Sequence, residues 1–383
     1  MAGPARILEL LVSTDLGGGP AHVRDLVARL PRAEFEVTVG GPLDGPFAEV
    51  FRSMGIDVVE VPTRRLGPGP LRRLRDVIED RAIDLVHSHG KGAGLYGRLA
   101  ARRAGIAAVH TFHGIHVPAS PPGAGAAYLA LERWLARHSD AVIHVSASQA
   151  RAAARLRLGS EESTRLVVNG IDAARVAALA AERALPRRAL GLDPERLVVG
   201  TVARFDPVKG LDVLVEAVAR LATRSRVALL LVGDGPEGAA LRTLVERRGL
   251  RGTVLFPGAV PDAARCLGAI DVYVSASRAE GLPLAVLEAM ACRRPVVATR
   301  VPGHVDVIES GQSGVLVPPD DPDALARAVD ELLREPARRE ALGEGARARV
   351  ERDFSADRMA AQTAEVYRDA LARHPRPLAI PGV

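Results

Sequence analysis

The sequence predicts an α/β protein built from two doubly wound domains, and three observations support this prediction. The chain has 383 residues, which is more than one ordinary domain holds and favours two. Short apolar runs alternate with helix-like stretches along almost the whole chain, as in parallel sheets covered by helices on both faces. This alternation is interrupted once, at residues 184–195, where two prolines and a glycine separate two series of elements.

The first series of strands is expected in the amino-terminal half of the chain, where each run is short and rich in aliphatic residues. The predicted strands are Ile7–Val12, Phe35–Val39, Asp57–Val61, Asp84–His87, Ala107–Phe112, Ala141–Val145 and Arg165–Val168. Apolar residues recur at helical spacing between them. The predicted helices are Ala21–Leu30, Leu71–Asp80, Tyr96–Ala104, Tyr128–His138 and Ala173–Arg183. Helices of this kind between parallel strands give βαβ units.

The second series repeats this pattern after the break. Its predicted strands are Leu197–Val202, Val227–Val232, Thr253–Phe256, Asp271–Val274, Pro295–Ala298 and Val315–Val317, and its predicted helices are Leu211–Leu221, Gly238–Arg248, Pro283–Cys292 and Asp323–Arg334. We therefore expect an amino-terminal Rossmann-like domain at residues 1–190 and a carboxyl-terminal one at 191–355. The amphipathic stretch 356–373 is expected to be a final helix that packs on the first domain.

Composition excludes several classes of protein. Hydrophobic residues make up 48% and charged residues 25% of the chain, so disordered and fibrous proteins are not expected. Apolar runs such as Val227–Val232 are too short to span a membrane, and the first strand is too short and too charged for a signal peptide. Two cysteines cannot form a disulfide framework or a cysteine-rich zinc site. These features predict a soluble, intracellular protein in a reducing compartment.

The charge balance does not favour a nucleic-acid partner. The net charge is only +5, runs of one sign are short, and aromatic residues make up 3% of the chain. Aromatic side chains that could stack on single-stranded bases are therefore scarce. Lys91 and Lys209 are the only two lysines, since nearly every cation is arginine. A lysine retained in such a chain can mark a position that needs a compact ammonium group.

In open parallel sheets ligands bind beyond the carboxyl ends of the strands, and the segment Ser277–Ala291 lies at such a place. It follows a predicted strand and opens a helix, so Gly281 and Leu282 lie at a helix amino terminus that suits a phosphate group. Glu280 stands just outside that helix and Glu288 lies eight residues further on, inside it. Carboxylates of this kind can clamp the hydroxyls of a sugar or ribose. The alternative is a capping glutamate and an ordinary exposed one.

The loop Thr201–Gly210 ends the first strand of the second domain and carries Arg204 and Lys209. Two cations in a strand-end loop of the same sheet would neutralise a diphosphate. The alternative is that both are simply solvated loop cations.

Together these residues carry a family resemblance that covers nearly the whole chain. The sequence resembles the retaining glycosyltransferases of family 4, which have the two-domain GT-B architecture with a cleft between the domains. Glu280 and Glu288 resemble the Glu-x₇-Glu element of that family, and Arg204 with Lys209 resembles its diphosphate-binding pair. The resemblance implies that Glu280 binds hydroxyls of the donor sugar and that Glu288 binds the ribose of the nucleotide.

The same resemblance assigns further residues to the donor. Gly281 and Leu282 would offer backbone N–H groups to the diphosphate. The segment Val254–Val260 is similar to the one whose backbone meets the base, which indicates Phe256 and Gly258.

The amino-terminal domain contributes a glycine-rich loop and three histidines. Asp15–His22 is a turn between the first strand and first helix, and glycine there lets the backbone approach a ligand closely. It resembles the family loop that closes over donor phosphates or acceptor, so Gly18 and Gly19 are candidates; a plain tight turn is the alternative. His113, at a strand end, resembles the active-site histidine that contacts the donor sugar. His87 and His89 could line the acceptor side or be simple loop residues.

Two further motifs match known ligand-binding patterns but do not predict a ligand here. Gly233–Gly238 matches the GxGxxG dinucleotide fingerprint, but the acidic residue expected about 20 positions later is missing, so NAD is not expected. Asp321–Asp323 has the Asp-x-Asp form of a metal clamp, yet its place before a helix predicts an N-cap. The sequence therefore predicts no metal site, with Arg204, Lys209 and a helix dipole stabilising the leaving group instead.

The resemblance implies transfer of a hexosyl unit from a nucleotide diphosphate sugar to an acceptor hydroxyl, with retention and without an obligatory cofactor or metal. A UDP-sugar is the first choice of donor and a GDP-sugar the second. A small molecule, a glycan and a lipid-linked sugar all remain open as acceptors. A nucleotide-sugar epimerase of the same fold and a non-catalytic nucleotide-sugar-binding protein are the alternatives.

One arginine-rich stretch is relevant to the cellular location of the protein. A cluster of cations surrounds one predicted helix of the first domain and is interspersed with leucines: Arg64, Arg65, Arg72, Arg73 and Arg75. Such a face either contacts anionic lipid headgroups or is an ordinary solvated surface. The expected location is the cytoplasm, with the inner face of the membrane as an alternative, and the oligomeric state stays open.

Overall fold

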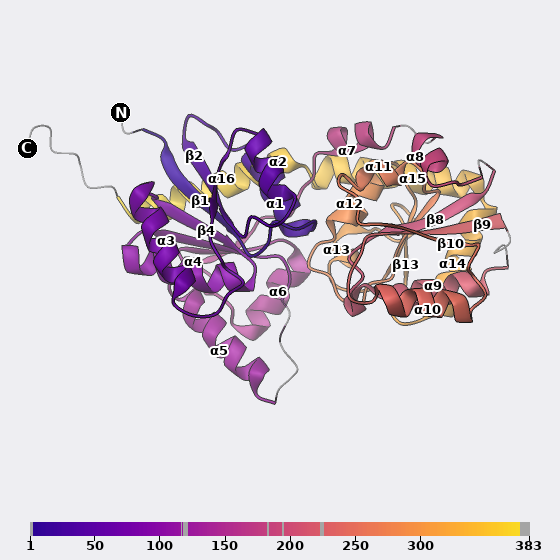
Figure 1. Ribbon diagram of the computed structural model, residues 1–383, viewed down its shortest axis with the longest axis horizontal. Helices are drawn as coiled ribbons and strands as arrows, with labels where there is room; N and C mark the ends of the chain where they lie inside the picture. Colours follow the sequence, from indigo (N-terminus) through magenta and orange to yellow (C-terminus); the bar gives the residue numbers. More distant parts are fainter. Residues whose placement is uncertain are drawn as a thin grey trace, which may run out of the picture. The chain divides into compact units, whose positions relative to one another are not determined.

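The computed structural model describes residues 3–115, 117, 122–181, 184–193, 195–222 and 226–375. The chain divides into two compact units, each with its own twisted sheet between layers of helices (Figure 1). The first unit comprises the chain up to Val168 together with the segment from Ala356 onward, and the second comprises Asn169–Ser355. The prediction of two doubly wound α/β units is thus confirmed.

The first unit contains a seven-stranded, fully parallel sheet in the order β3-β2-β1-β4-β5-β6-β7. Its strands are β1 (Ala5–Leu11), β2 (Phe35–Gly41), β3 (Asp57–Glu60), β4 (Leu85–His89), β5 (Ala107–Phe112), β6 (Ala141–His144) and β7 (Thr164–Leu166). The strand order reverses between β1 and β4, which are neighbours in the sheet. A reversal of this kind opens a crevice at the carboxyl ends of the strands, where ligands of doubly wound sheets bind.

Helices cover both faces of this sheet. One face, which includes Ile7, Leu85 and Val109, packs against α1 (Gly18–Val27), α2 (Phe47–Ser53) and the final helix α16 (Ala356–Ala372). The other face packs against four helices: α3 (Gly69–Asp80), α4 (Lys91–Ala104), α5 (Ala124–Ala136) and α6 (Ala147–Leu156). The chain therefore returns at its end to close the core of its first unit.

The second unit repeats this topology with a six-stranded parallel sheet, β10-β9-β8-β11-β12-β13. Its strands are β8 (Leu197–Val202), β9 (Val227–Val232), β10 (Val254–Gly258), β11 (Val272–Ser275), β12 (Val296–Thr299) and β13 (Val315–Val317). One face shares a core with α9 (Leu211–Arg220), α10 (Gly238–Arg247) and α14 (Pro322–Arg334). The other packs on α12 (Leu284–Ala291), which contacts α7 (Ala173–Leu179), α11 (Ala264–Leu267) and α15 (Pro336–Asp353). Shorter elements are α8 (Ala184–Ala189), η1 (Pro207–Lys209) and α13 (His304–Val307).

The division between the units falls earlier than the sequence indicates. Residues 169–190 were expected in the first domain, but α7 packs against α12, where the Cys292 thiol lies 3.8 Å from the Val176 carbonyl oxygen. Arg187 of α8 is buried and donates to Asp271 at 2.7 Å. The segment 184–195, interpreted as a break, thus contributes a short helix that is anchored to the second sheet.

Helix α15 was not predicted, because its sequence is strongly polar and contains two glycines. Those glycines let it lie close to neighbouring backbone. A Cβ atom at Gly343 would come within 2.4 Å of the Arg293 carbonyl oxygen, and one at Gly345 within 2.1 Å of the Gln312 carbonyl oxygen. Along the described chain, no helix combines the length and apolar character needed to cross a bilayer.

Candidate active site

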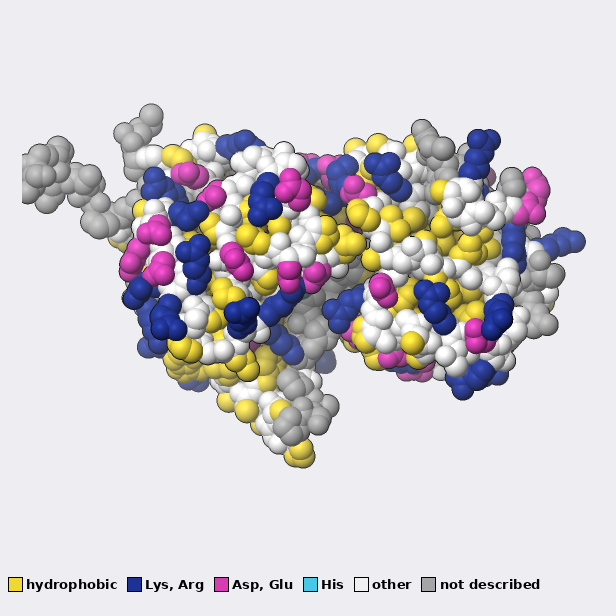
Figure 2. Space-filling view, viewed as in Figure 1, with side chains coloured by type: hydrophobic (Ala, Val, Ile, Leu, Met, Phe, Trp, Pro, Cys, Tyr) yellow, Lys and Arg dark blue, Asp and Glu magenta, His cyan; other side chains and the backbone are white. Residues whose placement is uncertain are grey.

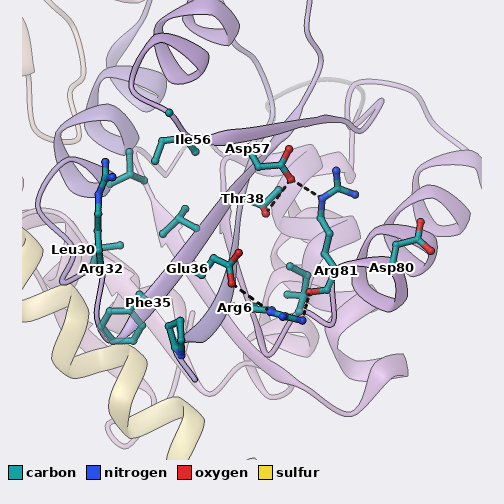
Figure 3. Close-up of a pocket in the computed structure, with 15 residues that line it drawn as sticks. Arg6, Leu30, Arg32, Phe35, Glu36, Thr38, Ile56, Asp57, Asp80 and Arg81 are labelled. Atoms are coloured by element: carbon teal, nitrogen blue, oxygen red, sulfur yellow. Dashed lines mark hydrogen bonds and ion pairs between the residues drawn. The ribbon is translucent and has the colours of Figure 1, made fainter. Parts of the chain in front are cut away.

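A cavity of about 500 Å³ opens at the amino ends of the strands in the first unit (Figure 3). Four of its charged side chains form two ion pairs. Arg6 lies 3.4 Å from Glu36, and Arg81 donates to Asp57 at 2.7 Å. Ligands of doubly wound sheets bind at the opposite edge, so this cavity is not the candidate site.

At the carboxyl edge of the first sheet, polar side chains gather where the strand order reverses. Glu9 of β1 is in register with His87 of β4, and His89 is in register with Thr111 of β5. Residues in register on parallel strands point to the same face, which brings these four side chains together. All four are buried. Sequence reasoning missed Glu9, although a glutamate in the middle of an apolar strand was a signal that could have identified it.

Hydrogen bonds join these side chains into one network. His89 Nε2 lies 2.8 Å from Glu9 Oε2, and Tyr367 of α16 donates to the other carboxylate oxygen. His87 contacts the Tyr367 hydroxyl through Nδ1 at 2.5 Å and the Thr111 hydroxyl through Nε2 at 2.7 Å. Helix α16, distant in sequence, therefore supplies a member of this network.

The network ends at His113, just after β5. His89 Nδ1 lies 3.0 Å from His113 Nε2. Because the Glu9 carboxylate can only accept, His89 donates from Nε2, so its Nδ1 accepts from His113 Nε2–H. The second nitrogen of His113, Nδ1, is then a lone-pair acceptor. We call Glu9, Tyr367, His87, His89 and His113 the histidine relay.

The glycine-rich loop lies beside the histidine relay. Gly18 and Gly19 are the first residues of α1, and a Cβ atom at Gly19 would lie 4.0 Å from the His113 ring. One turn further on, the His22 ring contacts the His113 ring edge to face, with centroids 4.9 Å apart. The structure thus brings Gly19 and His113 together, and it adds His22, which sequence reasoning missed.

Burial and mutual contacts determine the protonation of the relay. Burial and the neighbouring His87 lower the pKa of His89 to about 4, and burial with His22 holds the pKa of His113 well below its usual range. Burial alone would raise the pKa of Glu9, but His87 and His89 together hold it far below its usual range. At neutral pH the relay therefore combines one ionised carboxylate with neutral imidazoles at His89 and His113.

Two overlapping groups in this region have atoms close enough together to hold a metal ion. They are His22 with His89 and His113, and Glu9 with His87 and His89. Sequence reasoning found neither group, because their members come from separate strands, one loop and one helix. Several of these atoms already hydrogen-bond to one another, as in the contacts of Glu9 with His89 and of His89 with His113.

In the second unit the corresponding edge carries a charged pair. Lys209, at the end of η1, places its Nζ 2.7 Å from Glu280 Oε1, and the Ser277 hydroxyl donates to the same oxygen at 2.6 Å. The Glu280 side chain is only 10% exposed. Burial alone would raise the pKa of Glu280, and Lys209 and Ser277 together lower it below its ordinary value. The site therefore holds an ionised carboxylate against an ammonium group.

Two glycines with positive φ allow the loops of this pair to meet. Gly210 has φ +60°, and a Cβ atom there would come within 2.1 Å of the Ala276 carbonyl oxygen. Gly303 has φ +86°, and a Cβ atom there would lie 2.8 Å from the Gly281 carbonyl oxygen. Only glycine combines this backbone with such close contact.

Arg278, which sequence reasoning missed, fixes the same loops. It donates to the Pro207 carbonyl at 2.6 Å, to Asp212 at 2.8 and 3.0 Å, and to Asp320 at 2.7 Å. Three segments are thereby tied around the loop that carries Lys209. Its role is to position the site.

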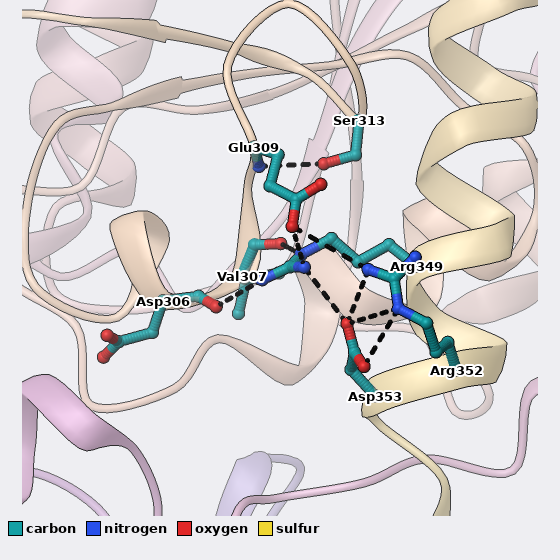
Figure 4. Close-up of polar contacts among 7 residues, drawn as sticks. All are labelled: Asp306, Val307, Glu309, Ser313, Arg349, Arg352 and Asp353. Carbon is teal, nitrogen blue, oxygen red and sulfur yellow. Dashed lines mark hydrogen bonds and ion pairs between the residues drawn. The ribbon is translucent and has the colours of Figure 1, made fainter.

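His304 holds the strand end that leads to the loop of the Lys209–Glu280 pair. Its Nδ1 lies 2.8 Å from the Thr299 carbonyl oxygen, so Nδ1 donates and Nε2 accepts from the Ser275 hydroxyl at 2.9 Å. The loop after α13 is held by Arg349 of α15, which donates to the Val307 carbonyl at 2.6 Å and pairs with Glu309 (Figure 4).

The other predicted donor residues are dispersed around this edge. Arg204 is 67% exposed and pairs with Asp206 at 2.9 Å, so it does not contact the Lys209–Glu280 pair. Gly281 and Leu282 are buried immediately before α12, and Glu288 is half-buried on that helix. Within the described chain, no side chain caps the amino end of α12.

Phe256 and Gly258 lie on β10 at the same edge of the sheet. The Arg242 guanidinium covers the Phe256 ring at 4.4 Å. The Gly258 carbonyl accepts from Gly233 N–H at 2.9 Å, which joins the end of β10 to the loop after β9.

The GxGxxG segment and the Asp-x-Asp segment have local structural roles. A Cβ atom at Gly233 would lie 1.9 Å from the Ala203 carbonyl oxygen, so this glycine lets two loops pack together. Asp321 caps α14 by accepting from Ala324 N–H at 2.8 Å, as predicted.

Two Rossmann-like units with polar groups at the carboxyl edge of each sheet are the architecture of the GT-B glycosyltransferases, and solved structures of that class match the chain over nearly its whole length. The solved structure of HepE from Anabaena in complex with UDP and glucose covers 95% of this chain and 99% of its own, with a TM-score of 0.83 and 25% identity. Sucrose-phosphate synthase from Thermosynechococcus elongatus covers 96% of this chain and 100% of its own, with a TM-score of 0.81 and 26% identity.

The sequence comparisons identify the family. The profile described as Glycosyltransferase Family 4 matches residues 16–175, and that of Glycosyl transferases group 1 matches residues 182–349. A D-inositol 3-phosphate glycosyltransferase from Salinispora tropica is 30% identical over 425 aligned positions, spanning 97% of this chain and 86% of its own. The chain belongs to the family 4 glycosyltransferases with the GT-B fold, and the resemblance stated from the sequence is confirmed.

Proposed function

We propose that this glycosyltransferase moves a hexosyl unit from a UDP-sugar to an acceptor hydroxyl with retention at the anomeric carbon. The observation that carries the proposal is the Lys209–Glu280 pair beside the start of α12. An ammonium group and a helix amino terminus suit a diphosphate, and an ionised carboxylate suits sugar hydroxyls. HepE, of similar fold, binds UDP-glucose, which supports a UDP-sugar here; a GDP-sugar is the second choice.

The remaining donor contacts are assigned on the same basis. Arg204 turns from Asp206 toward the diphosphate when the donor is bound, and Gly281 and Leu282 offer their backbone N–H groups to it. Glu288 on α12 binds the ribose. Phe256 and Gly258, at the end of β10, lie beside the base.

The histidine relay acts on the sugar through His113. A neutral imidazole whose Nε2–H is donated to His89 offers Nδ1 as an acceptor for a sugar hydroxyl. His87 and His89 were expected on the acceptor side, but both rings are buried and hydrogen-bonded. We therefore assign them to positioning His113, and we assign Gly18 and Gly19 to close backbone approach to the donor.

The reaction needs no enzyme nucleophile. The bond between the anomeric carbon and the diphosphate oxygen breaks, the acceptor oxygen bonds to the same face of that carbon, and the acceptor proton passes to the leaving phosphate. Lys209, Arg204 and the α12 amino terminus stabilise the negative charge that develops on the diphosphate. Because these groups can supply the counter-charge, we propose that the transfer is independent of metal and of any other cofactor.

The acceptor is a hydroxyl of a small molecule, a glycan or a lipid-linked sugar. Product analysis in the absence of acceptor separates transfer from epimerisation, because an epimerase would convert the nucleotide sugar to its epimer. Product analysis in the presence of acceptor separates transfer from non-catalytic binding, because a binding protein would leave the nucleotide sugar intact.

The proposal is tested by thermal stabilisation with UDP, GDP, ADP and NAD in the presence of EDTA. A ligand that binds only the folded protein raises its stability by about 2.7 kcal/mol at 100 times its Kd. We expect UDP to stabilise the protein most. Stabilisation by NAD alone, or a strict need for a divalent ion in turnover, would contradict the proposal.

The sugar contact is tested separately with Glu280→Gln. We expect this variant to lose turnover of the UDP-sugar while it keeps most of its affinity for UDP. An equal loss of both would remove Glu280 from the sugar site.

A further inference from the structure

Helix α5 has an unusual distribution of polarity. Its exposed residues lie on one side of the helix and are all apolar: Ala126, Ala127, Ala130, Leu131 and Trp134. We call these five residues the α5 face. Leu131 is 40% and Trp134 37% exposed. A surface helix of a water-soluble domain normally turns its apolar residues inward and its charges outward. An apolar surface of this kind marks a place of contact with something other than water.

The acidic residue of α5 points into the protein instead. Glu132 is buried and accepts a hydrogen bond from Arg98 of α4 at 2.7 Å, and the Arg98 side chain is fully buried. Arg98 also donates to the Gly94 carbonyl at 2.7 Å. This buried ion pair removes a carboxylate from the surface around the α5 face.

The exposed charged residues of the stretch from Leu85 to Ser139 are all positive. Between Leu85 and Ser139 the sequence contains no acidic residue other than Glu132. The exposed cations of the same stretch are Lys91, Arg102, Arg103 and Arg137. The Arg102 guanidinium lies 5.1 Å from the centre of the Trp134 ring, and the His138 ring contacts the same indole edge to face, with ring centroids 4.8 Å apart. Figure 2 shows hydrophobic side chains over α5 with dark blue cations beside them.

The arginine cluster around α3 offers a useful contrast. Arg64 pairs with Asp15 and Asp44, and Arg75 pairs with Asp76. Arg64 and Arg75 are thus neutralised by neighbouring carboxylates, whereas the stretch Leu85–Ser139 that holds α4 and α5 has no acidic residue other than the buried Glu132. Of the two basic stretches, the one that includes α5 combines an apolar centre with an excess of positive charge.

We infer that the α5 face docks on a lipid bilayer that contains anionic lipids. Leucine and tryptophan insert at the level of the headgroups, where tryptophan is enriched, and arginine side chains reach lipid phosphates around them. One-sided positive charge selects an anionic bilayer over an uncharged apolar partner such as a second copy of this chain. This inference goes beyond the proposed transfer reaction and does not depend on it.

The single tryptophan of the chain makes the test direct, because all indole fluorescence comes from Trp134. The full-length protein is mixed with vesicles of phosphatidylcholine alone or of phosphatidylcholine with phosphatidylglycerol. We expect sedimentation with the anionic vesicles, a blue shift of the emission, and quenching by brominated acyl chains. Binding should weaken with salt. Absence of binding, or binding without any change in Trp134 emission, would overturn the inference.

Matched variants locate the contact. We expect Leu131→Glu to reduce anionic-vesicle binding at least about ten-fold and Arg103→Ala about five-fold, the scale for one cation at an anionic surface. The controls are Leu66→Glu, at a 91% exposed leucine next to α3, and Arg75→Ala. Equal loss in the controls would place the contact at α3 and contradict the inference. An unchanged thermal unfolding midpoint shows that each variant is folded. A stable dimer with Trp134 shielded before lipid is added would also overturn the inference.

Discussion

The two units share a strand order and place polar groups at the same edge, yet their sites are built differently. In the first unit, Glu9, His87 and His89 lie on strands, and burial keeps the His89 imidazole neutral. In the second, Lys209 and Glu280 lie on loops and remain oppositely charged. The comparison teaches that one topology can present two kinds of polar group. Rigid strands hold a hydrogen-bonding relay that ends in neutral imidazoles, which would suit sugar hydroxyls, and glycine-bearing loops hold charges that would suit a diphosphate.

The two sites also differ in how closely they are tied to the core. The relay crosses the interior of its unit from β1 to α16, so its groups contribute to the packing of the unit as well as to the proposed site. The groups of the second site are partly exposed and are held by Arg278 and by close packing at Gly210 and Gly303. Changes in the first site should therefore affect stability and activity together, whereas some changes in the second should affect activity alone.

The largest effect is expected from Lys209→Ala. Loss of one group that stabilises transition-state charge lowers turnover by about 100- to 1000-fold, as for an oxyanion-hole donor. Steady-state kinetics with the UDP-sugar measure this, and Lys209→Arg should recover part of the activity. Arg251→Ala, at a cation 79% exposed, is the matched control. Wild-type kinetics in Lys209→Ala would show that the charged site of the second unit does not serve the diphosphate.

Lowering the pH should destabilise the first unit, because the relay residue His89 is neutral in the folded protein. Folding lowers the pKa of His89 from 6.5 to about 4. Between pH 6.5 and pH 4, His89 is therefore protonated in the unfolded chain but neutral in the folded protein. The contribution of His89 to stability is therefore complete above pH 6.5 and falls by about 3 kcal/mol as the pH drops to 4. The lowered pKa values of His113 and His144 add losses in the same direction. Urea unfolding followed by Trp134 fluorescence measures the total in the first unit. His89→Gln should reduce the slope by the share of His89, and a wild-type profile without any loss in this window would contradict the assignment.

Tyr367→Phe should have an intermediate effect on both properties. It removes the hydroxyl that bridges Glu9 and His87, leaving a buried carboxylate with one partner fewer, which costs about 1–3 kcal/mol of stability. We also expect roughly ten-fold lower turnover, through the misplacement of His113, and unchanged affinity for UDP. Tyr96→Phe is the control, because the Tyr96 hydroxyl bonds only backbone atoms of Arg65 and Gly67 among its described contacts. Equal activity in the two variants would leave the relay a purely structural role.

The smallest effect on stability is expected from Arg204→Ala. Its guanidinium is 67% exposed and pairs with Asp206 two residues away, so its removal should change the free energy of unfolding by less than about 0.5 kcal/mol. Turnover should nevertheless fall, since the side chain is assigned to the diphosphate. A loss of stability above about 2 kcal/mol would mean that Arg204 is part of the core structure. The second site would then be tied to the core as closely as the first.

Much of the donor-side assignment could be predicted because its residues are close together in the sequence. Glu280, Gly281 and Leu282 are consecutive, and Glu288 lies in the helix that begins directly after them. Arg204 and Lys209 lie in one connecting segment between a strand and a helix. Local spacing of this kind carries a signal that a single sequence preserves. The positioning residues Arg278 and His304 escaped notice because partners such as Asp212 and Ser275 lie on other segments.

The sequence by itself determined the two doubly wound sheets, the position of nearly every strand, and the family. These follow from the alternation of apolar runs and from short motifs, which are local properties. Only the tertiary structure decided that Glu9 and Tyr367 meet His87, that residues 169–190 join the second unit, and that α5 turns its apolar side outward. Each depends on contacts between segments far apart in the chain, and burial, which neutralises His89 and hides Glu132, exists only once those segments have packed together.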